Sequence, residues 1–166
     1  PEHLMRICHI ADIHWRGLTR HAEYKKTFED LANDLKSKNV DLIFIGGDIF
    51  HTKTSGISPE YIDAMTWWFD TLASIAPVHV ILGNHDGNLI NLTRQDAISP
   101  IISALKSNRI TLYKKSGVFP IAAGFNLCVL SVFDIEGWKE VKPPKNEINI
   151  GCFHGPLRGS KSEEGW

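Results

Sequence analysis

The chain has 166 residues, of which 43% are hydrophobic, so it can bury one substantial core, and we expect a single domain over residues 1–166. Its formal net charge is −1, from 18 basic and 19 acidic side chains, and this balance does not by itself favour binding to nucleic acid or to a membrane. No leader pattern is visible and no apolar run approaches the roughly 20 residues that cross a bilayer, so we expect a soluble cytoplasmic protein, of cellular or phage origin, without a membrane partner.

Short apolar runs alternate with amphipathic segments in the first half, which is typical of a sheet built from βα units. The predicted strands are Met5–Ala11, Asp41–Ile45 and Pro77–Leu82. Helical spacing of apolar residues predicts one helix over His21–Lys38 and a second that opens at Ser58-Pro59, where serine caps and proline takes the first position. The second helix should face the core with Ile62, Met65, Phe69 and Leu72.

The second half has a different sequence pattern, in which short β-like runs alternate with turns rich in Gly, Pro and Lys. These runs lie near Ile110–Leu112, Phe125–Phe133 and Glu147–Phe153, and they predict a second sheet. Val141–Lys145, which contains two prolines, should be a stiff exposed connection. Three cysteines, Cys8, Cys128 and Cys152, lie in apolar runs without a CxxC pair and predict buried thiols in a reducing compartment.

Four polar clusters each follow a predicted strand. They are Asp12-Ile13-His14, Gly47-Asp48-Ile49-Phe50-His51, Gly83-Asn84-His85-Asp86 and His154-Gly155. Strand ends on one sheet edge lie close in space, so we expect these side chains to converge on one site. Any one cluster is a weak signal, because short motifs recur by chance, but four in order at strand ends are a strong one.

The residue types in these clusters suit a pair of divalent metal ions. In an extended segment Asp12 and His14 point the same way and grip one ion, and the two oxygens of Asp48 bridge two ions. Asn84 offers a carbonyl oxygen and His154 a ring nitrogen to the second ion. Such oxygen and nitrogen shells accept manganese, iron or zinc. Two ions about 3.5–4 Å apart hold a phosphate and activate a shared water as the nucleophile.

Two further histidines are candidates for catalytic roles. His85 stands beside the predicted ligand Asn84, and a near-neutral pKa would suit it as donor of a proton to the leaving oxygen. His51 either holds the phosphate or orients a ligand, with a loop histidine that only packs as the alternative. His9 and His79 lie inside apolar strands, where packing is the favoured interpretation.

Other residues allow both a functional and a structural interpretation. Arg16 and Lys53 follow the first two clusters and are weak candidates for substrate phosphate contacts, although each alone is more often a solvated charge. A local basic cluster of Lys106, Arg109, Lys114 and Lys115 either tracks a DNA backbone or is an ordinary surface stretch. Trp67 and Trp68 favour packing over base stacking, and a homodimer contact there is a further possibility.

The motif series Asp12-x-His14, Gly47-Asp48-x-x-His51, Gly83-Asn84-His85-Asp86 and His154-Gly155 resembles the signature of the calcineurin-like metallophosphoesterases. Within that family, Gly-Asp-Ile-Phe-His and Val-Ile-Leu-Gly-Asn-His-Asp are most similar to the SbcD-like nucleases of bacteria and phage, relatives of the eukaryotic double-strand-break repair nuclease. Most phosphatase branches carry Gly-Asp-x-x-Asp or Gly-Asn-His-Glu instead. His51 is therefore the branch-specific residue.

The resemblance runs from Met5 to Gly155 and implies an α/β fold, a two-sheet β-sandwich flanked by helices in αββα order. It implies cleavage of DNA phosphodiesters with Mn²⁺, or alternatively Fe²⁺, Zn²⁺ or Mg²⁺, and an SMC-like ATPase as partner. The family's ligand roles fall on Asp12 and His14 for the first metal, on Asp48 for both, and on Asn84 and His154 for the second. His85 matches the proton donor and His51 the assisting histidine.

One departure concerns the end of the site. The family closes it with Gly-His-x-His, yet no histidine follows His154 before Trp166, so each metal lacks one expected ligand. We expect an N-terminal fragment of a longer protein, whose truncation precedes the last strands, the DNA-capping domain and the ATPase-docking segment. The alternatives are that a partner or water fills the gap, or that the chain is a degraded copy.

The sequence thus predicts a two-metal DNA nuclease of a recombination or repair system. The alternatives are a generic small-molecule phosphodiesterase or phosphatase, and a metal-binding scaffold that has lost catalysis.

Overall fold

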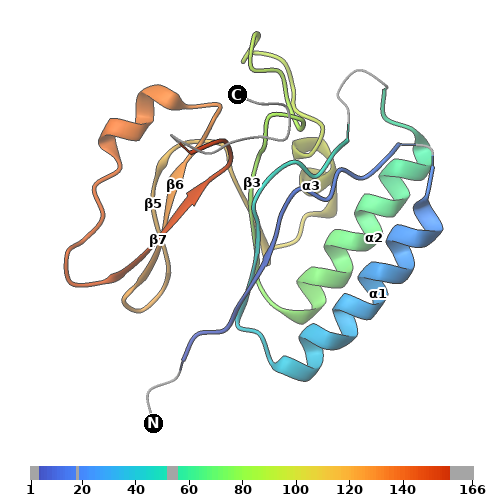
Figure 1. Ribbon diagram of the computed structural model, residues 1–166, viewed down its shortest axis with the longest axis horizontal. Helices are drawn as coiled ribbons and strands as arrows, with labels where there is room; N and C mark the ends of the chain where they lie inside the picture. Colours follow the sequence, from blue (N-terminus) through green and yellow to red (C-terminus); the bar gives the residue numbers. More distant parts are fainter. Residues whose placement is uncertain (1–3, 18, 52–55, 158–166) are drawn as a thin grey trace.

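The computed structural model describes residues 4–17, 19–51 and 56–157, and Lys53 and the segment 160–166 lie outside them. A four-stranded parallel sheet has the order β1-β2-β3-β4. Its strands are β1 (Ile7–Ile10), β2 (Leu42–Ile45), β3 (Val78–Ile81) and β4 (Ile110–Tyr113). One face is covered by α1 (His21–Lys38), α2 (Pro59–Ile75) and α3 (Ser99–Leu105) (Figure 1).

A second sheet lies against the other face of the first (Figure 1). It consists of β5 (Gly117–Ala122), β6 (Phe125–Leu130) and β7 (Ile148–Phe153), with β5 and β6 antiparallel and β6 and β7 parallel. The two sheets meet in a small core of Ile81, Tyr113, Leu127, Val129 and Cys152. A short 3₁₀ helix, η1 (Ile135–Glu140), packs against β5 and β6. The predicted α/β architecture of two sheets with flanking helices is confirmed.

The larger core lies between the first sheet and the helices, and aromatic side chains fill much of it. Trp15 is fully buried, stacks on Tyr24 at 4.7 Å and on Phe28 at 5.3 Å between ring centroids, and lies 6.2 Å from Trp68. Trp15 immediately follows the first polar cluster. The same ring that joins α1 to α2 therefore also anchors the segment that carries Asp12 and His14.

Helix α2 begins as its sequence predicts. The Ser58 hydroxyl accepts a hydrogen bond from the backbone N–H of Tyr61 at 3.1 Å, and Pro59 takes the first helical position. The expectation that Ile62 faces the core is wrong, because Ile62 is 45% exposed while Tyr61 is fully buried. The buried stripe of a helix can include either of two neighbouring positions, and in α2 it includes Tyr61, whose ring lies 4.6 Å from that of Phe50 between centroids.

The assignment of Ile110–Leu112 to the second sheet is also wrong, because β4 pairs in parallel with β3 at the edge of the first sheet. Nothing in the run itself signals this placement, since it has the same β-like character as the runs that follow it.

Helix α3, strand β5 and η1 were not expected. Each is short, at seven, six and six residues, and therefore shows too little periodicity to be recognised.

Smaller expectations are mostly confirmed. Residues 141–145 form an exposed connection, and Cys128 and Cys152 are buried free thiols, whereas Cys8 is half-buried. His79 packs against Tyr113, and its Nδ1 lies 2.7 Å from the Tyr113 hydroxyl oxygen. Trp68 is fully buried and Trp67 half-buried, so packing explains the first, while a dimer contact at the second stays a prediction. None of the helices in the described part is both long and apolar enough to span a membrane.

Truncation of Trp15 should test its role as the anchor of the first motif. We expect Trp15→Ala to lower the free energy of unfolding by about 3–5 kcal/mol, because it empties a fully buried site among aromatic rings. Trp67→Ala is the matched control on the half-buried side of α2 and should cost about 1 kcal/mol. Urea unfolding followed by far-UV circular dichroism measures both, and equal losses would refute this role for Trp15.

Candidate metal centre

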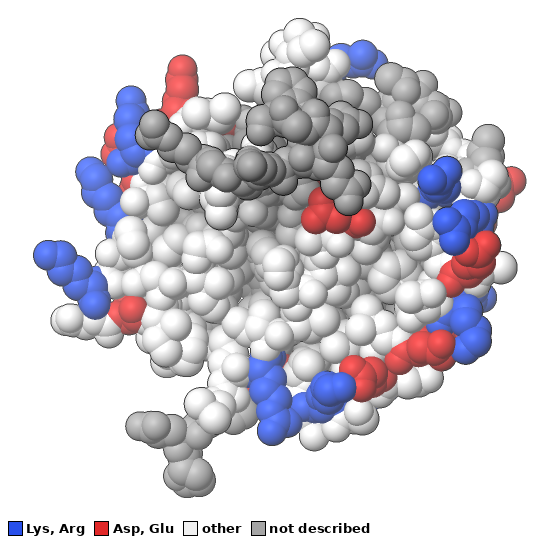
Figure 2. Space-filling model, viewed as in Figure 1, with Lys and Arg blue, Asp and Glu red and all other residues white. Residues whose placement is uncertain are grey.

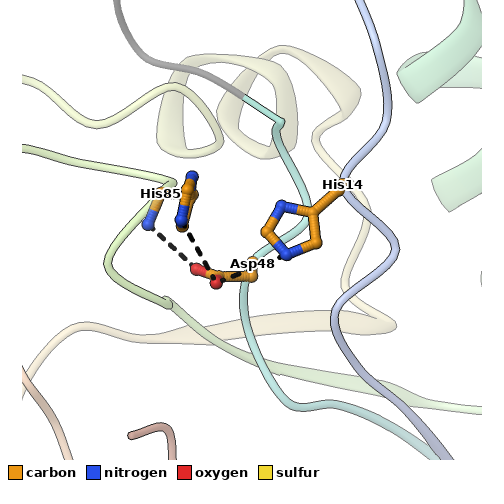
Figure 3. Close-up of side chains that lie close together, drawn as sticks. All are labelled: His14, Asp48 and His85. Carbon is orange, nitrogen blue, oxygen red and sulfur yellow. Dashed lines mark hydrogen bonds and ion pairs between the residues drawn. The ribbon is translucent and has the colours of Figure 1, made fainter. Parts of the chain in front are cut away.

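The carboxyl ends of four strands bring the polar clusters together. Asp12 and His14 follow β1, Asp48 follows β2, Asn84 and His85 follow β3, and His154 follows β7 of the second sheet. In the close-up, His14 and His85 flank the carboxylate of Asp48 from two different loops (Figure 3). This convergence is the one that parallel strand ends predict.

Asp48 is the centre of the cluster. Its side chain is almost fully buried, and three imidazole nitrogens surround one carboxylate oxygen, Oδ2. The Nε2 atoms of His154, His14 and His85 lie 3.2, 3.7 and 4.0 Å from it. The second oxygen, Oδ1, accepts a hydrogen bond from the backbone N–H of His85 at 2.9 Å. A single buried carboxylate thus lies against residues from the other three strand-end loops.

The backbone around these residues is strained in the way that functional sites often are. Asp12, His14 and Asp48 have φ values of 54°, 44° and 51°, in the left-handed region that non-glycine residues rarely adopt. The expectation that Asp12 and His14 occupy an extended segment is therefore wrong. Hydrogen bonds between the two loops maintain these conformations, from the N–H of Asp12 to the Gly47 carbonyl at 3.1 Å and from that of His14 to the Asp48 carbonyl at 3.0 Å.

Two glycines make room for the carboxylate and a histidine. A Cβ on Gly83 would collide with the backbone nitrogen and Oδ1 of Asp48. A Cβ on Gly47, whose φ is 94°, would lie 2.8 Å from Nδ1 of His154 and 2.6 Å from the nitrogen of Gly83. Gly47 and Gly83, which open the second and third clusters, are thus required by close approach within the site itself.

Backbone carbonyls fix the orientation of two rings. Nδ1 of His154 lies 2.8 Å from the Gly46 carbonyl oxygen, and Nδ1 of His85 lies 2.9 Å from that of His51. A proton on each Nδ1 satisfies these contacts and directs Nε2 towards Asp48, which is the arrangement common to histidines that bind metals. The Tyr24 hydroxyl donates to the carbonyl of His14 at 2.9 Å and so ties α1 to the same loop.

Asp48 and His154 shift each other's pKa in opposite directions. Burial acts to raise the pKa of Asp48, but hydrogen bonds from His154 and from the backbone of His85 outweigh it, and the net pKa lies below its usual value. The hydrogen bond to Asp48 raises the pKa of His154 to about 9, against the opposing effect of burial. Without a metal, the cluster therefore holds an imidazolium in contact with a carboxylate at neutral pH.

Asp86 has a structural function that its sequence position did not reveal. It is fully buried, and its two oxygens accept hydrogen bonds from the backbone N–H groups of Phe50 at 2.9 Å and Gly83 at 2.8 Å. Burial raises its pKa to about 6, against these backbone hydrogen bonds. Asp86 therefore joins the loop of Asp48 to the loop of Asn84 and His85. The sequence holds one indication that Asp86 matters, which is its position in the third cluster. Its hydrogen-bond partners are identified only by the fold.

The donor set fits divalent ions. Two close triads share Asp48, one with His14 and His85 and the other with Asp12 and His154, and within each triad the ligand atoms lie within 4.8 Å of one another. Oxygen and imidazole donors in such a group suit manganese, iron or zinc. Asn84 lies beside His85 and is exposed, so it is accessible from solvent. Which ion each side chain takes, and whether His85 is a ligand or an acid, stay predictions.

The other predicted residues lie at the edge of the centre. The His51 ring is 5.8 Å from that of His14, and burial together with the charge of Arg16 lowers its pKa. Arg16 is exposed near His51, as a phosphate contact requires, whereas Lys53 lies outside the described residues.

Positive charge is not concentrated on the face seen in Figure 2, where Lys and Arg lie around the rim and the middle is mostly uncharged. Within the predicted basic cluster, Lys114 pairs with Asp96 at 2.8 Å and Lys115 with Asp134 at 3.7 Å. Two of its four charges are therefore balanced locally, which favours the structural interpretation of that cluster.

Comparison with known proteins gives a consistent result. The sequence pattern of the calcineurin-like phosphoesterase family matches residues 5–166. A protein of Acanthamoeba polyphaga mimivirus described as uncharacterized is 41% identical over 96% of the chain. One component of the nuclease SbcCD of Bacillus subtilis is 31% identical over 58% of the chain, and the DNA double-strand break repair protein Mre11 of Archaeoglobus fulgidus is 33% identical over 49%. The chain spans 13%, 25% and 19% of the lengths of these three relatives.

Gly83→Ala should disrupt the centre directly. Because the new Cβ collides with Asp48, we expect the carboxylate to move and Mn²⁺ affinity to fall by at least about tenfold, the range seen when groups that position ligands are lost. Gly151→Ala is the matched control, since nothing lies within 4 Å of its Cβ position. Isothermal titration with MnCl₂ measures both variants, and unchanged affinity in Gly83→Ala would show that Asp48 does not bind the ion in this geometry.

The pKa of His154 predicts the pH dependence of metal binding. The ion pair with Asp48 stabilises the metal-free domain fully below the unfolded pKa of 6.5, and this stabilisation is lost as pH rises through about 9. Metal must displace that proton, so Mn²⁺ affinity should rise across this window by up to about tenfold per pH unit. His154→Gln should bind more weakly and with a flatter pH dependence. A steep rise retained in His154→Gln would assign the released proton to another group.

Proposed function

Because the chain belongs to the calcineurin-like phosphoesterase family, we propose that it hydrolyses phosphodiester bonds of DNA with two divalent metal ions. The observation that carries this proposal is the buried Asp48 carboxylate, which three histidine Nε2 atoms approach within 4.0 Å at the ends of four strands. Family membership indicates a hydrolase that acts on phosphate esters, without specifying its substrate. The nuclease activity, the metal and the residue roles belong to the proposal.

Five side chains would hold the ions: Asp12, His14, Asp48, Asn84 and His154. We propose Mn²⁺ as the native metal, because a shell of carboxylate, amide and imidazole donors suits it, with Fe²⁺, Zn²⁺ and Mg²⁺ as alternatives. When bound, a pair of such ions supplies charge neutralisation for the phosphate and activation of water near neutral pH. The Nδ1–carbonyl contact of His154 keeps its Nε2 on the inner side of the site and ready to bind.

We propose His85 as the general acid. Its Nδ1 is held by the His51 carbonyl, so the other nitrogen, Nε2, is directed towards the centre, 4.0 Å from Oδ2 of Asp48. A protonated His85 can donate from Nε2 to the leaving oxygen while its ring orientation stays fixed. His51 would position His85 through this carbonyl and contact the substrate phosphate with its ring, and Arg16 would add a second phosphate contact from the rim.

DNA as substrate is supported by the relatives. The two cellular proteins carry the words nuclease and DNA double-strand break repair in their names, and the chain is about one third identical to each over about half of its own length. The Bacillus relative is named as one subunit of a nuclease. From the resemblance to the SbcD-like nucleases, we further propose that the chain acts in recombination or repair with an SMC-like ATPase as its partner.

A small phosphodiester is the second candidate substrate. The near-neutral charge and the mostly uncharged face in Figure 2 favour it, because nucleic-acid binding usually relies on phosphate contacts with Lys and Arg. The two candidates require the same metal chemistry but differ in substrate size.

The test uses the purified chain in Mn²⁺ with end-labelled linear single- and double-stranded DNA and with bis(p-nitrophenyl) phosphate. We expect both substrates to be cleaved, and Asp48→Asn to lower both rates by at least about a hundredfold. Asp70→Asn is the matched control, because Asp70 is an exposed acid on α2 away from the strand ends. DNA left intact while the diester turns over would favour the small-molecule enzyme, and no turnover of either would favour a metal-binding scaffold.

A further inference from the structure

A cavity of about 540 Å³ lies beside the metal centre and is not used by the proposed chemistry. It forms between the segment around Phe50 and the loop of residues 86–97 that follows β3. The residues of its lining that matter here are Phe50, Asp86, Asn88, Arg94, Gln95 and Pro100. Its volume lies in the range of sites that bind small organic ligands.

The cavity and the metal centre share two turns of the chain. Phe50 and Asp86 line the cavity, while their chain neighbours His51 and His85 belong to the centre. The hydrogen bond from Phe50 to Asp86 holds these two turns together. On both turns the cavity therefore begins one residue away from the centre.

The loop over the cavity is fixed at both ends. Asn88 Oδ1 accepts hydrogen bonds from the backbone N–H groups of Ile90 at 2.9 Å and Asn91 at 3.0 Å. At the other end, the N–H of Ala97 donates to the Asp86 carbonyl at 2.8 Å, and Lys114 pairs with Asp96. The cavity is thus pre-formed, which lowers the ordering cost of binding.

The loop presents unused polar groups to this space. Arg94 and Gln95 are exposed, and their side chains make no hydrogen bond or ion pair within residues 4–17, 19–51 and 56–157. A guanidinium suits a phosphate because it forms two parallel hydrogen bonds, and a primary amide can read the edge of a base. Since Lys114 already balances Asp96, this acid near the loop's end adds little repulsion for an anion.

The cavity also offers apolar contacts of the kind that a base requires. Ile57, which is 43% exposed, and Pro100 give its wall aliphatic surface, and Phe50 lies beneath that wall with 1% of its surface exposed. Beyond it, the same loop exposes Ile90 completely. An apolar wall with a cation and an amide at its mouth matches a nucleotide better than it matches a free phosphate or a simple aryl ester.

We propose that this cavity binds one unpaired nucleotide adjacent to the scissile phosphate, with Arg94 on its phosphate and Gln95 on its base. The inference rests on the proposed nuclease function and narrows its substrate to single strands or frayed ends. A base inside an intact duplex is stacked and paired, so it cannot enter such a cavity without being unstacked.

Binding in the absence of metal tests this site independently of catalysis. The probe is a short fluorescein-labelled single strand, with its blunt duplex for comparison, followed by fluorescence anisotropy in EDTA. We expect the single strand to bind more tightly than the duplex, and Arg94→Ala and Gln95→Ala each to weaken single-strand binding by roughly tenfold. Lys36→Ala is the matched control, because Lys36 is an exposed cation in the last turn of α1, at the end of the sheet opposite the strand ends that carry the centre. Thermal melts of these surface variants verify that they fold.

The outcomes separate the site from the nuclease function. Unchanged single-strand affinity in both Arg94→Ala and Gln95→Ala overturns the proposed site, even if the chain cleaves DNA. An equal loss in Lys36→Ala also overturns it, since the effect would then be general electrostatic attraction. A loss of single-strand affinity that is confined to Arg94→Ala and Gln95→Ala supports the site. This holds even if the metal-loaded chain does not cleave DNA, a result that would refute the proposed function alone.

Discussion

The burial of one carboxylate is the constraint on which the rest of the site depends. Asp48 is 4% exposed, and an isolated charge in such a position would be costly. The cost is offset by His154, which contacts Oδ2, and by the backbone of His85, which donates to Oδ1. Asp48 therefore needs the loops after β3 and β7 in place before it can be charged, and this requirement couples the two sheets.

The same constraint explains features that would otherwise be unrelated. Gly83 must lack a side chain because Asp48 occupies the space, and Asp86 must be acidic because it holds the Gly83 and Phe50 backbones on either side. Left-handed conformations at Asp12, His14 and Asp48 are unfavourable, and the hydrogen bonds between the first two loops stabilise them. Trp15 then secures those loops to the helical core.

The sequence predicts the elements that have strong local patterns. Helix α1 begins and ends at the predicted residues, and the first three strands fall inside the predicted runs, because apolar periodicity is a local property. The position of β4 in the first sheet was not predictable from its own residues, since strand order is decided by long-range packing. The choice of Tyr61 over Ile62 for the core depends similarly on how α2 lies against its neighbours.

For the site, the sequence identifies the residues but not how they are held. Residue type and position at strand ends were enough to propose that Asp12, His14, Asp48 and His154 converge, and the structure brings them together. The left-handed conformations of Asp12, His14 and Asp48 depend on contacts between distant loops, and so do the hydrogen bonds by which Asp86 joins two of these loops. No local sequence pattern encodes such contacts. The cavity beside the centre was missed for the same reason, because the segments around Phe50 and Arg94 meet only in the fold.

The most direct test of a two-metal centre around Asp48 is anomalous diffraction from crystals of the chain grown with Mn²⁺. Data collected at the manganese absorption edge should show two peaks about 3.5–4 Å apart, one on each side of the Asp48 carboxylate. Both peaks should lie among the side chains of Asp12, His14, Asn84 and His154. A single peak, or none near Asp48 in crystals soaked at high Mn²⁺, would contradict a bridging role for this carboxylate.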